Sequence, residues 1–235
     1  MPSHIPHRCT VVFSLILGLL GASCATERGP APGAAPLAAE FAPPPDPKRL
    51  HLELIEKMLE AGRAHAALAH LDALSPEEAA APPARLLRAE ALRRTGQQGA
   101  AWKLYEPLLI TEAAAPAWRG LALIKADQGD LETSVAWLRR ARDLQPTAAR
   151  IRNDLGYALL LRGELESARV ELVTALELES SRRTARNLVL VLLLENQLDA
   201  AQRLAQRHGI EEAAFERLQQ RADRLRARTA TGGDA

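Results

Sequence analysis

Five residues that readily end helices recur along this chain at an almost constant spacing. They are Gly62, Gly96, Gly129, Gly163 and Asn196, and successive members lie 34, 33, 34 and 33 residues apart. Glycine and asparagine tolerate the left-handed backbone conformation in which many helices terminate. A period of about 34 residues with a turn inside each repeat is typical of stacked helix pairs. The spacing therefore predicts an all-α solenoid of about five helix pairs.

Small and apolar residues keep the register of these turns. Seven residues before each turn, on the first helix, the chain has Ile55, Ala89, Ala122, Gly156 and Val189. Five residues after each turn, on the second helix, it has Ala67, Ala101, Ser134, Ala168 and Ala201. Nine residues after each turn it has Leu71, Tyr105, Leu138, Leu172 and Ala205, which we expect to fill the gap to the next pair. The alternative is a generic helical bundle in which this spacing is accidental. A bundle, however, has no reason to repeat a small residue five positions after each turn.

The third and fourth repeats resemble the tetratricopeptide consensus. In the third repeat the matching residues are Trp118, Leu121, Ala122, Gly129, Leu131, Leu138, Ala141 and Pro146. In the fourth they are Leu155, Gly156, Leu159, Gly163, Leu165, Ala168, Leu172 and Ala175. The other three repeats depart from the consensus, for example at Arg88, where an apolar residue is usual. We assign the tetratricopeptide-type array to residues 48–209. The resemblance implies a groove, lined by the first helix of each pair, that binds protein or peptide partners.

The register places seven residues of the third to fifth pairs in that groove. They are Arg119, Leu123, Arg150, Asn153, Tyr157, Arg186 and Leu190. A basic groove with an aromatic and apolar floor would suit an extended peptide or a helix with acidic ends. The alternative is that these arginines only keep the helices soluble.

Residues 210–228 form the predicted capping helix of the array. Ala214, Leu218, Ala222 and Leu225 recur at helical spacing and give this segment one apolar face. The remaining positions are mostly charged, as the outer surface of a terminal repeat has to be. Docking of this helix to a partner is the alternative. Residues 229–235 are expected to be a disordered tail.

The N-terminal residues have the form of an export signal. A short polar start, the apolar run at 11–20 and three small residues precede Cys24. The stretch at 20–24 resembles a bacterial lipobox, which implies cleavage after residue 23 and lipidation of Cys24. Ala25 follows the cysteine, which implies the periplasmic face of the outer membrane. Residues 24–47, rich in Pro and Ala, are the predicted tether. The alternative is a secretory signal, cut near Ala25, that releases a soluble periplasmic protein.

The chain lacks the patterns that carry chemistry. No nucleophile elbow, phosphate loop or dinucleotide fingerprint occurs, so we do not expect an enzyme or a cofactor. A formal net charge of +1 argues against a nucleic-acid partner. His65 and His70 are five residues apart, which misaligns them on a helix, and no acidic or cysteine cluster joins them. We therefore expect no metal site.

Residues 153–163 and 186–201 resemble the tetratricopeptide lipoprotein of the tight-adherence (Tad) pilus assembly system. The resemblance implies a scaffold that binds envelope proteins during assembly of a Flp-type pilus, near its outer-membrane secretin. Two other binding roles stay open: a type IV pilus pilotin-like protein and an adaptor for peptidoglycan hydrolases. An enzyme subunit would need a catalytic domain on another chain.

Overall fold

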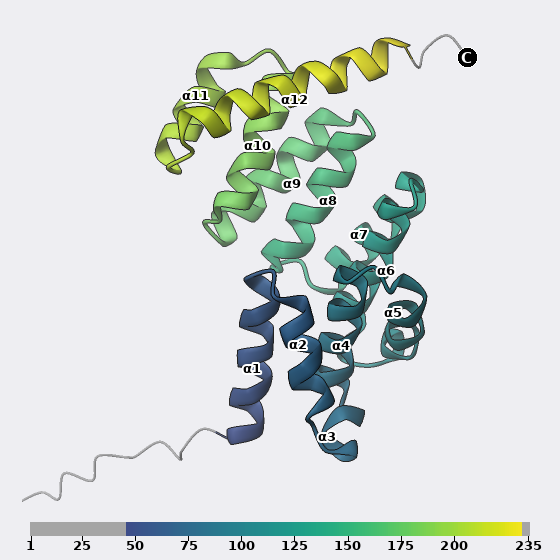
Figure 1. The fold of residues 1–235 in the computed structure, drawn as a ribbon. Helices are drawn as coiled ribbons and strands as arrows, with labels where there is room; N and C mark the ends of the chain where they lie inside the picture. The colour runs from purple at the N-terminus through teal and green to yellow at the C-terminus, as the bar shows by residue number, and fades with distance from the viewer. Residues whose placement is uncertain (1–45, 232–235) are drawn as a thin grey trace, which may run out of the picture. The chain divides into compact units, whose positions relative to one another are not determined.

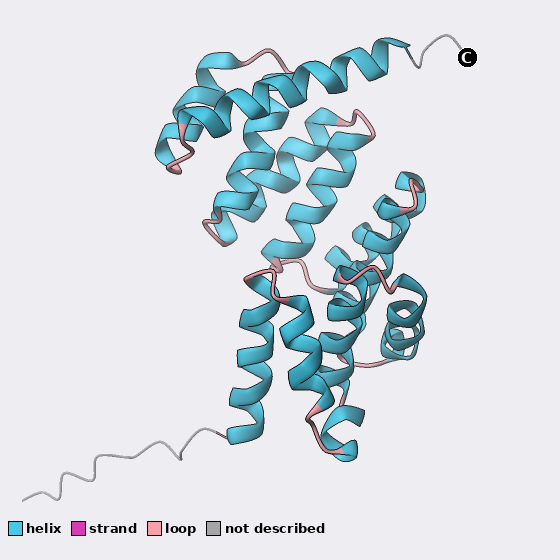
Figure 2. Cartoon of the chain, in the orientation of Figure 1, coloured by secondary structure: helices cyan, strands magenta, loops and turns pink. Residues whose placement is uncertain are grey.

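Helices follow one another in pairs along residues 46–231, the part of the chain that the computed structural model describes (Figure 1). Side chains are described as far as Arg228. The predictions for the signal, for Cys24 and for the tether up to residue 45 lie outside these residues. The described part is helical throughout, with short loops and no strand (Figure 2). None of its helices is both long and apolar enough to cross a membrane.

The five predicted pairs are confirmed. The first pair is α1 (Pro47–Glu60) and α2 (Ala64–Asp72), and the second is α4 (Pro82–Arg94) and α5 (Gln98–Tyr105). The third is α6 (Ala114–Asp127) and α7 (Leu131–Leu144), and the fourth is α8 (Ala149–Leu161) and α9 (Leu165–Leu178). The fifth is α10 (Arg182–Leu194) and α11 (Leu198–Arg207), and α12 (Glu212–Thr231) follows it.

The turn inside each pair has the predicted conformation. The φ angles of Gly62, Gly96, Gly129, Gly163 and Asn196 are 75, 82, 84, 83 and 61°. Asn196 is the single non-glycine residue with a positive φ among the described residues. An L-residue with a larger side chain would be strained at these points, which explains why Gly and Asn recur there. Gly209, which links α11 to α12, adopts the same conformation with φ 60°.

Close approach of the paired helices follows from the small residues. Ala67, Ala101, Ser134, Ala168 and Ala201 are all fully buried. Gly156 on α8 lies against α9 so closely that an added Cβ would be 2.6 Å from the Leu172 Cγ atom. Tyr105 crosses from the second pair to the third, where its ring lies against Gly120 of α6. The predicted register of the core is therefore confirmed.

The first pair stacks on the rest of the array. Both α1 and α2 pack against α4. Arg88 of α4 is at a position that is usually apolar, and it donates to the Leu71 carbonyl at 2.8 Å and pairs with Asp72 at 2.6 Å. Arg94 donates to the Leu59 carbonyl at 2.5 Å. Arginines of α4 thus bind the C-terminal ends of α1 and α2, where carbonyl groups lack helical partners.

Several local elements differ from the sequence interpretation. A short helix, α3 (Pro76–Ala80), begins at a capping box made by Ser75 and Glu78. A 3-10 turn at Glu106–Ile110 follows α5 and includes Pro107. Helix α1 begins at Pro47, the last residue assigned to the tether, and Asp46 caps it. The predicted disorder of 229–235 is wrong for residues 229–231, which continue α12 because no helix breaker occurs before Gly232.

Candidate partner-binding groove

A cavity of about 330 Å³ opens between the first helices of the pairs. We call it the charged groove. Its lining comprises Lys57 and Glu60 of α1, Arg94 of α4, Arg119 of α6, Ala149, Arg150, Asn153 and Asp154 of α8, Arg183 and Thr184 of α10, and Glu179 and Ser181 before α10. Every pair contributes its first helix, as the tetratricopeptide resemblance implied.

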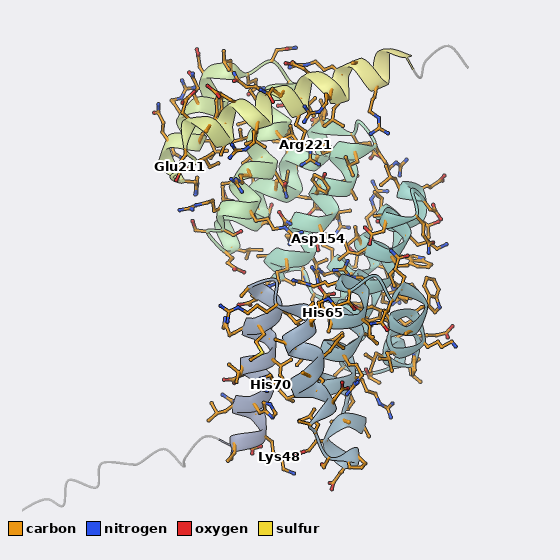
Figure 3. All side chains as sticks on the ribbon, in the orientation of Figure 1. Lys48, His65, His70, Asp154, Glu211 and Arg221 are labelled. Carbon is orange, nitrogen blue, oxygen red and sulfur yellow. The ribbon has the colours of Figure 1, made fainter. Side chains whose placement is uncertain are left out.

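Asp154 forms the floor of the charged groove (labelled in Figure 3). Its side chain is 2% exposed, and it accepts hydrogen bonds from Arg119 Nε at 2.6 Å and Arg183 Nη2 at 3.2 Å. Asn153 donates to the same carboxylate at 3.0 Å and accepts from Asn187 at 2.9 Å. Burial alone would lower the pKa of Arg119, but the Asp154 and Glu90 carboxylates outweigh it and raise that pKa. The floor is therefore a hydrogen-bonded network around the buried Asp154 that joins α6, α8 and α10.

Glu90 of α4 holds a second buried charge cluster beside the groove. It pairs with Arg93 at 2.9 Å and Arg94 at 2.5 Å, and it accepts a hydrogen bond from the Tyr105 hydroxyl at 3.0 Å. Burial would raise the pKa of Glu90, but the charges of Arg119 and Arg93 outweigh it and lower the pKa to about 2. Burial and the neighbouring Glu90 carboxylate raise the pKa of the Tyr105 hydroxyl, so it stays a hydrogen-bond donor.

The low pKa of Glu90 predicts a loss of stability in acid. Glu90 ionises at about 2 in the folded chain and near its ordinary 4.5 in the unfolded chain. Its stabilisation is therefore complete above pH 4.5 and disappears as the pH falls towards 2, a change of about 3 kcal/mol. We expect Glu90→Gln to destabilise the protein at pH 7 and to approach the wild type at pH 2–3. Urea unfolding across this range measures the difference; a gap that does not change with pH would contradict the assignment.

At the rim, Arg150 of α8 reaches across to the first pair. It pairs with Glu56 at 3.4 Å and makes a shorter contact with Glu60, both on α1. Glu60 also pairs with Lys57 at 2.9 Å. Arg150 is 49% exposed, so these ion pairs lie at the surface of the groove, in contrast to the buried pair below them.

Three of the seven predicted groove residues line the charged groove, namely Arg119, Arg150 and Asn153. Arg186 is exposed on α10 but lies outside the lining. Leu123 and Tyr157 are half-buried and also lie outside it. The prediction is wrong for Leu190, which is fully buried in the core. The expected aromatic and apolar floor is therefore replaced by a polar one.

Helix α12 explains this correction. It packs against α10 and inserts Phe215, Ala214 and Ala222 into the same core cluster as Leu190. Arg221 of α12 donates to the Tyr157 hydroxyl, and its guanidinium lies 5.3 Å from the centre of the Tyr157 ring (Figure 3 labels Arg221). The capping helix thus covers groove positions of the fourth and fifth pairs that the register had assigned to a partner.

The sequence interpretation missed Lys57, Glu60, Arg94, Asp154 and Arg183. One of them had a signal in the sequence: Arg183 lies 13 residues before Asn196, as Arg150 lies 13 before Gly163. Extending the register of Arg150 by one repeat would have found it. Elsewhere, His51 Nε2 and His70 Nδ1 lie 3.1 Å apart between α1 and α2. No group of three or more potential metal ligands occurs within residues 46–228.

Comparison with known proteins supports the same architecture, although no protein-family model matches the chain. A TPR repeat-containing protein of Pseudomonas aeruginosa, PA4299, is 41% identical over 161 residues, which are 68% of this chain and 64% of that protein. The chain thus spans somewhat less than two thirds of that relative.

Solved structures agree on the fold. TTC0263, a thermophilic TPR protein of Thermus thermophilus, superposes with a TM-score of 0.58 at 21% identity, over 76% of this chain and 98% of that one. PilF of Pseudomonas aeruginosa superposes with a TM-score of 0.57 at 17% identity, over 78% and 86%. The periodic turns, the paired helices and these similarities lead to one conclusion: the chain has the fold of a tetratricopeptide-type α-solenoid.

Proposed function

We propose that this chain is a lipid-anchored scaffold at the periplasmic face of the bacterial outer membrane. It binds a protein partner in the charged groove during assembly of a Tad/Flp-type pilus or its secretin. The charged groove is the observation that carries the partner-binding part of the proposal, because it is a hollow of about 330 Å³ to which all five pairs contribute. Tetratricopeptide folds bind protein or peptide partners at such surfaces.

The anchoring part of the proposal is supported by the N-terminal sequence. Cys24 follows an apolar run and three small residues, as in a bacterial lipobox, and the Pro- and Ala-rich residues 24–47 can supply reach from a membrane. The pilus part is supported by the resemblance of residues 153–163 and 186–201 to the Tad lipoprotein. The first of these segments begins with Asn153 and Asp154, which form the groove floor.

The anchor is tested in membrane fractions of cells that produce the native sequence and a Cys24→Ala variant. We expect mass spectrometry to find an acylated Cys24 at the mature N-terminus of the native protein. The variant should lose both the acyl chains and the membrane association. An unmodified, soluble product from the native sequence would refute the anchor.

The groove is tested with two arginines on the same helix. Arg183 lines the charged groove, whereas Arg186, three residues later, is exposed outside it. We expect Arg183→Glu to reduce co-purification of pilus or secretin components by roughly tenfold, the scale of one charge-assisted hydrogen bond. Arg186→Glu should leave it unchanged.

Circular dichroism establishes that both variants are folded. Equal capture by a folded Arg183→Glu variant contradicts the groove assignment. Capture of peptidoglycan hydrolases in place of pilus components would instead identify the protein as an adaptor for those enzymes.

A further inference from the structure

The charged groove carries more positive than negative charge. Five cations line it, namely Lys57, Arg94, Arg119, Arg150 and Arg183, against three carboxylates, namely Glu60, Asp154 and Glu179. Two carboxylates are each shared by two cations: Asp154 by Arg119 and Arg183, and Glu60 by Lys57 and Arg150. Glu56 and Glu90 lie beside the lining and neutralise part of this charge, because they pair with Arg150 and Arg94. The positive charge that a partner meets is therefore mainly that of the exposed Arg183 and Lys57.

The remaining charge lies where a partner can reach it. The Arg183 and Lys57 side chains are 68% and 74% exposed. Ala149 and Arg150, the first residues of α8, also line the groove, and no side chain caps the N-terminus of this helix. The positive end of the helix dipole therefore adds to the attraction of an anion.

Glu60 already occupies part of this surface. It belongs to the first pair, and its partner Arg150 lies 90 residues further along the chain on the fourth pair. Both side chains are at least 32% exposed, so their ion pair is weak and exchanges readily with another carboxylate. Glu56, one turn earlier on α1, pairs with Arg150 from the same side.

We propose that the charged groove accepts an acidic segment of the partner, and that Glu60, assisted by Glu56, holds the place of a partner carboxylate at Arg150 in the free chain. An incoming carboxylate exchanges with Glu60, while Arg183 provides a second contact above the buried Asp154. The inference rests on the proposed function only in taking the charged groove as the partner site. It defines the partner by its charge and makes the first helix pair an internal competitor.

The test uses the full chain and a fluorescein-labelled hexaglutamate peptide, with hexalysine as the control probe. Fluorescence anisotropy should detect binding of hexaglutamate and none of hexalysine. Glu60→Gln should tighten hexaglutamate binding about two- to fivefold, the range that one exposed ion pair supplies. Arg183→Glu should weaken it by roughly tenfold.

Glu53→Gln is the matched control, because Glu53 is an exposed α1 carboxylate that pairs with Arg49 outside the groove. Equal affinities of Glu60→Gln and Glu53→Gln would overturn the competition. A folded wild-type chain that does not bind hexaglutamate would overturn the acidic partner.

The outcomes separate this inference from the proposed function. Capture of a pilus component by a chain that does not bind hexaglutamate retains the proposed function and rejects the acidic segment. Binding of hexaglutamate by a chain that captures no envelope protein retains the acidic specificity of the charged groove and rejects the proposed function.

Discussion

Asp154→Ala should lower the free energy of unfolding by about 3–5 kcal/mol, the cost of removing one partner of a buried ion pair. The Asp154 side chain is 2% exposed, and it is the acceptor that joins Arg119 of α6, Arg183 of α10 and Asn153 of its own helix. Without it the Arg119 guanidinium stays charged in a largely buried place. The carboxylate of Glu90, which also acts on Arg119, offsets part of this cost.

Two further variants separate the buried pair from the exposed one. Arg183→Ala removes the exposed partner and should cost no more than about 1 kcal/mol. The double variant Arg119→Met with Asp154→Leu replaces the buried pair by apolar side chains of similar volume, and it should recover most of the stability lost in Asp154→Ala. Urea unfolding of all three variants measures these differences. A loss below about 1 kcal/mol in Asp154→Ala would show that the network contributes little to stability.

Gly120→Val should cost about 3 kcal/mol through overpacking between the second and third pairs. A Cβ atom on Gly120 would lie 2.2 Å from Tyr105 Cζ and 2.4 and 2.6 Å from its Cε atoms, far inside van der Waals contact. The ring cannot move aside easily, because Tyr105 is fully buried and its hydroxyl donates to Glu90. Thermal unfolding should show the loss as a decrease in Tm of roughly 6–12 °C.

Gly99 provides the matched comparison, because it is also a helical glycine but has open space where its Cβ would lie. We expect Gly99→Ala to stabilise the chain by up to about 1 kcal/mol through helix propensity. If both glycine variants changed the Tm in the same direction and by the same amount, the contact between Tyr105 and Gly120 would not be the cause.

The buried residues of the core could be predicted from the sequence, because the residue types that the turns and the helix contacts require are local and repeat in every pair. A left-handed turn needs Gly or Asn wherever it occurs, so Gly62 and Gly163 can be recognised without their neighbours. Five positions after each turn, a small residue such as Ala67 or Ala168 is buried where the second helix of the pair packs against the first. The same packing occurs in every pair. Five repetitions turn a weak signal into a reliable register.

The lining of the charged groove could be predicted from the sequence only in part. Arg119, Arg150 and Asn153 were found because they follow the register of the first helices, and Arg183 follows it as well. Leu190 follows the same register but is fully buried in a core cluster to which α12, a helix outside the repeat, contributes Phe215 and Ala222. The periodic pattern contains no information on where a terminal helix will pack.

The sequence by itself determined the helix pairs, their turns and the residues of their interfaces, because helix termination and close packing depend on residue type at a fixed spacing. Only the tertiary structure decided which charges meet. Glu60 pairs with Arg150 across 90 residues, and Asp154 joins three first helices, through contacts that the stacking of successive pairs creates. Because an ion pair constrains neither the turn nor the core spacing, the sequence pattern predicts the basic residues of the groove but not the carboxylates with which they pair.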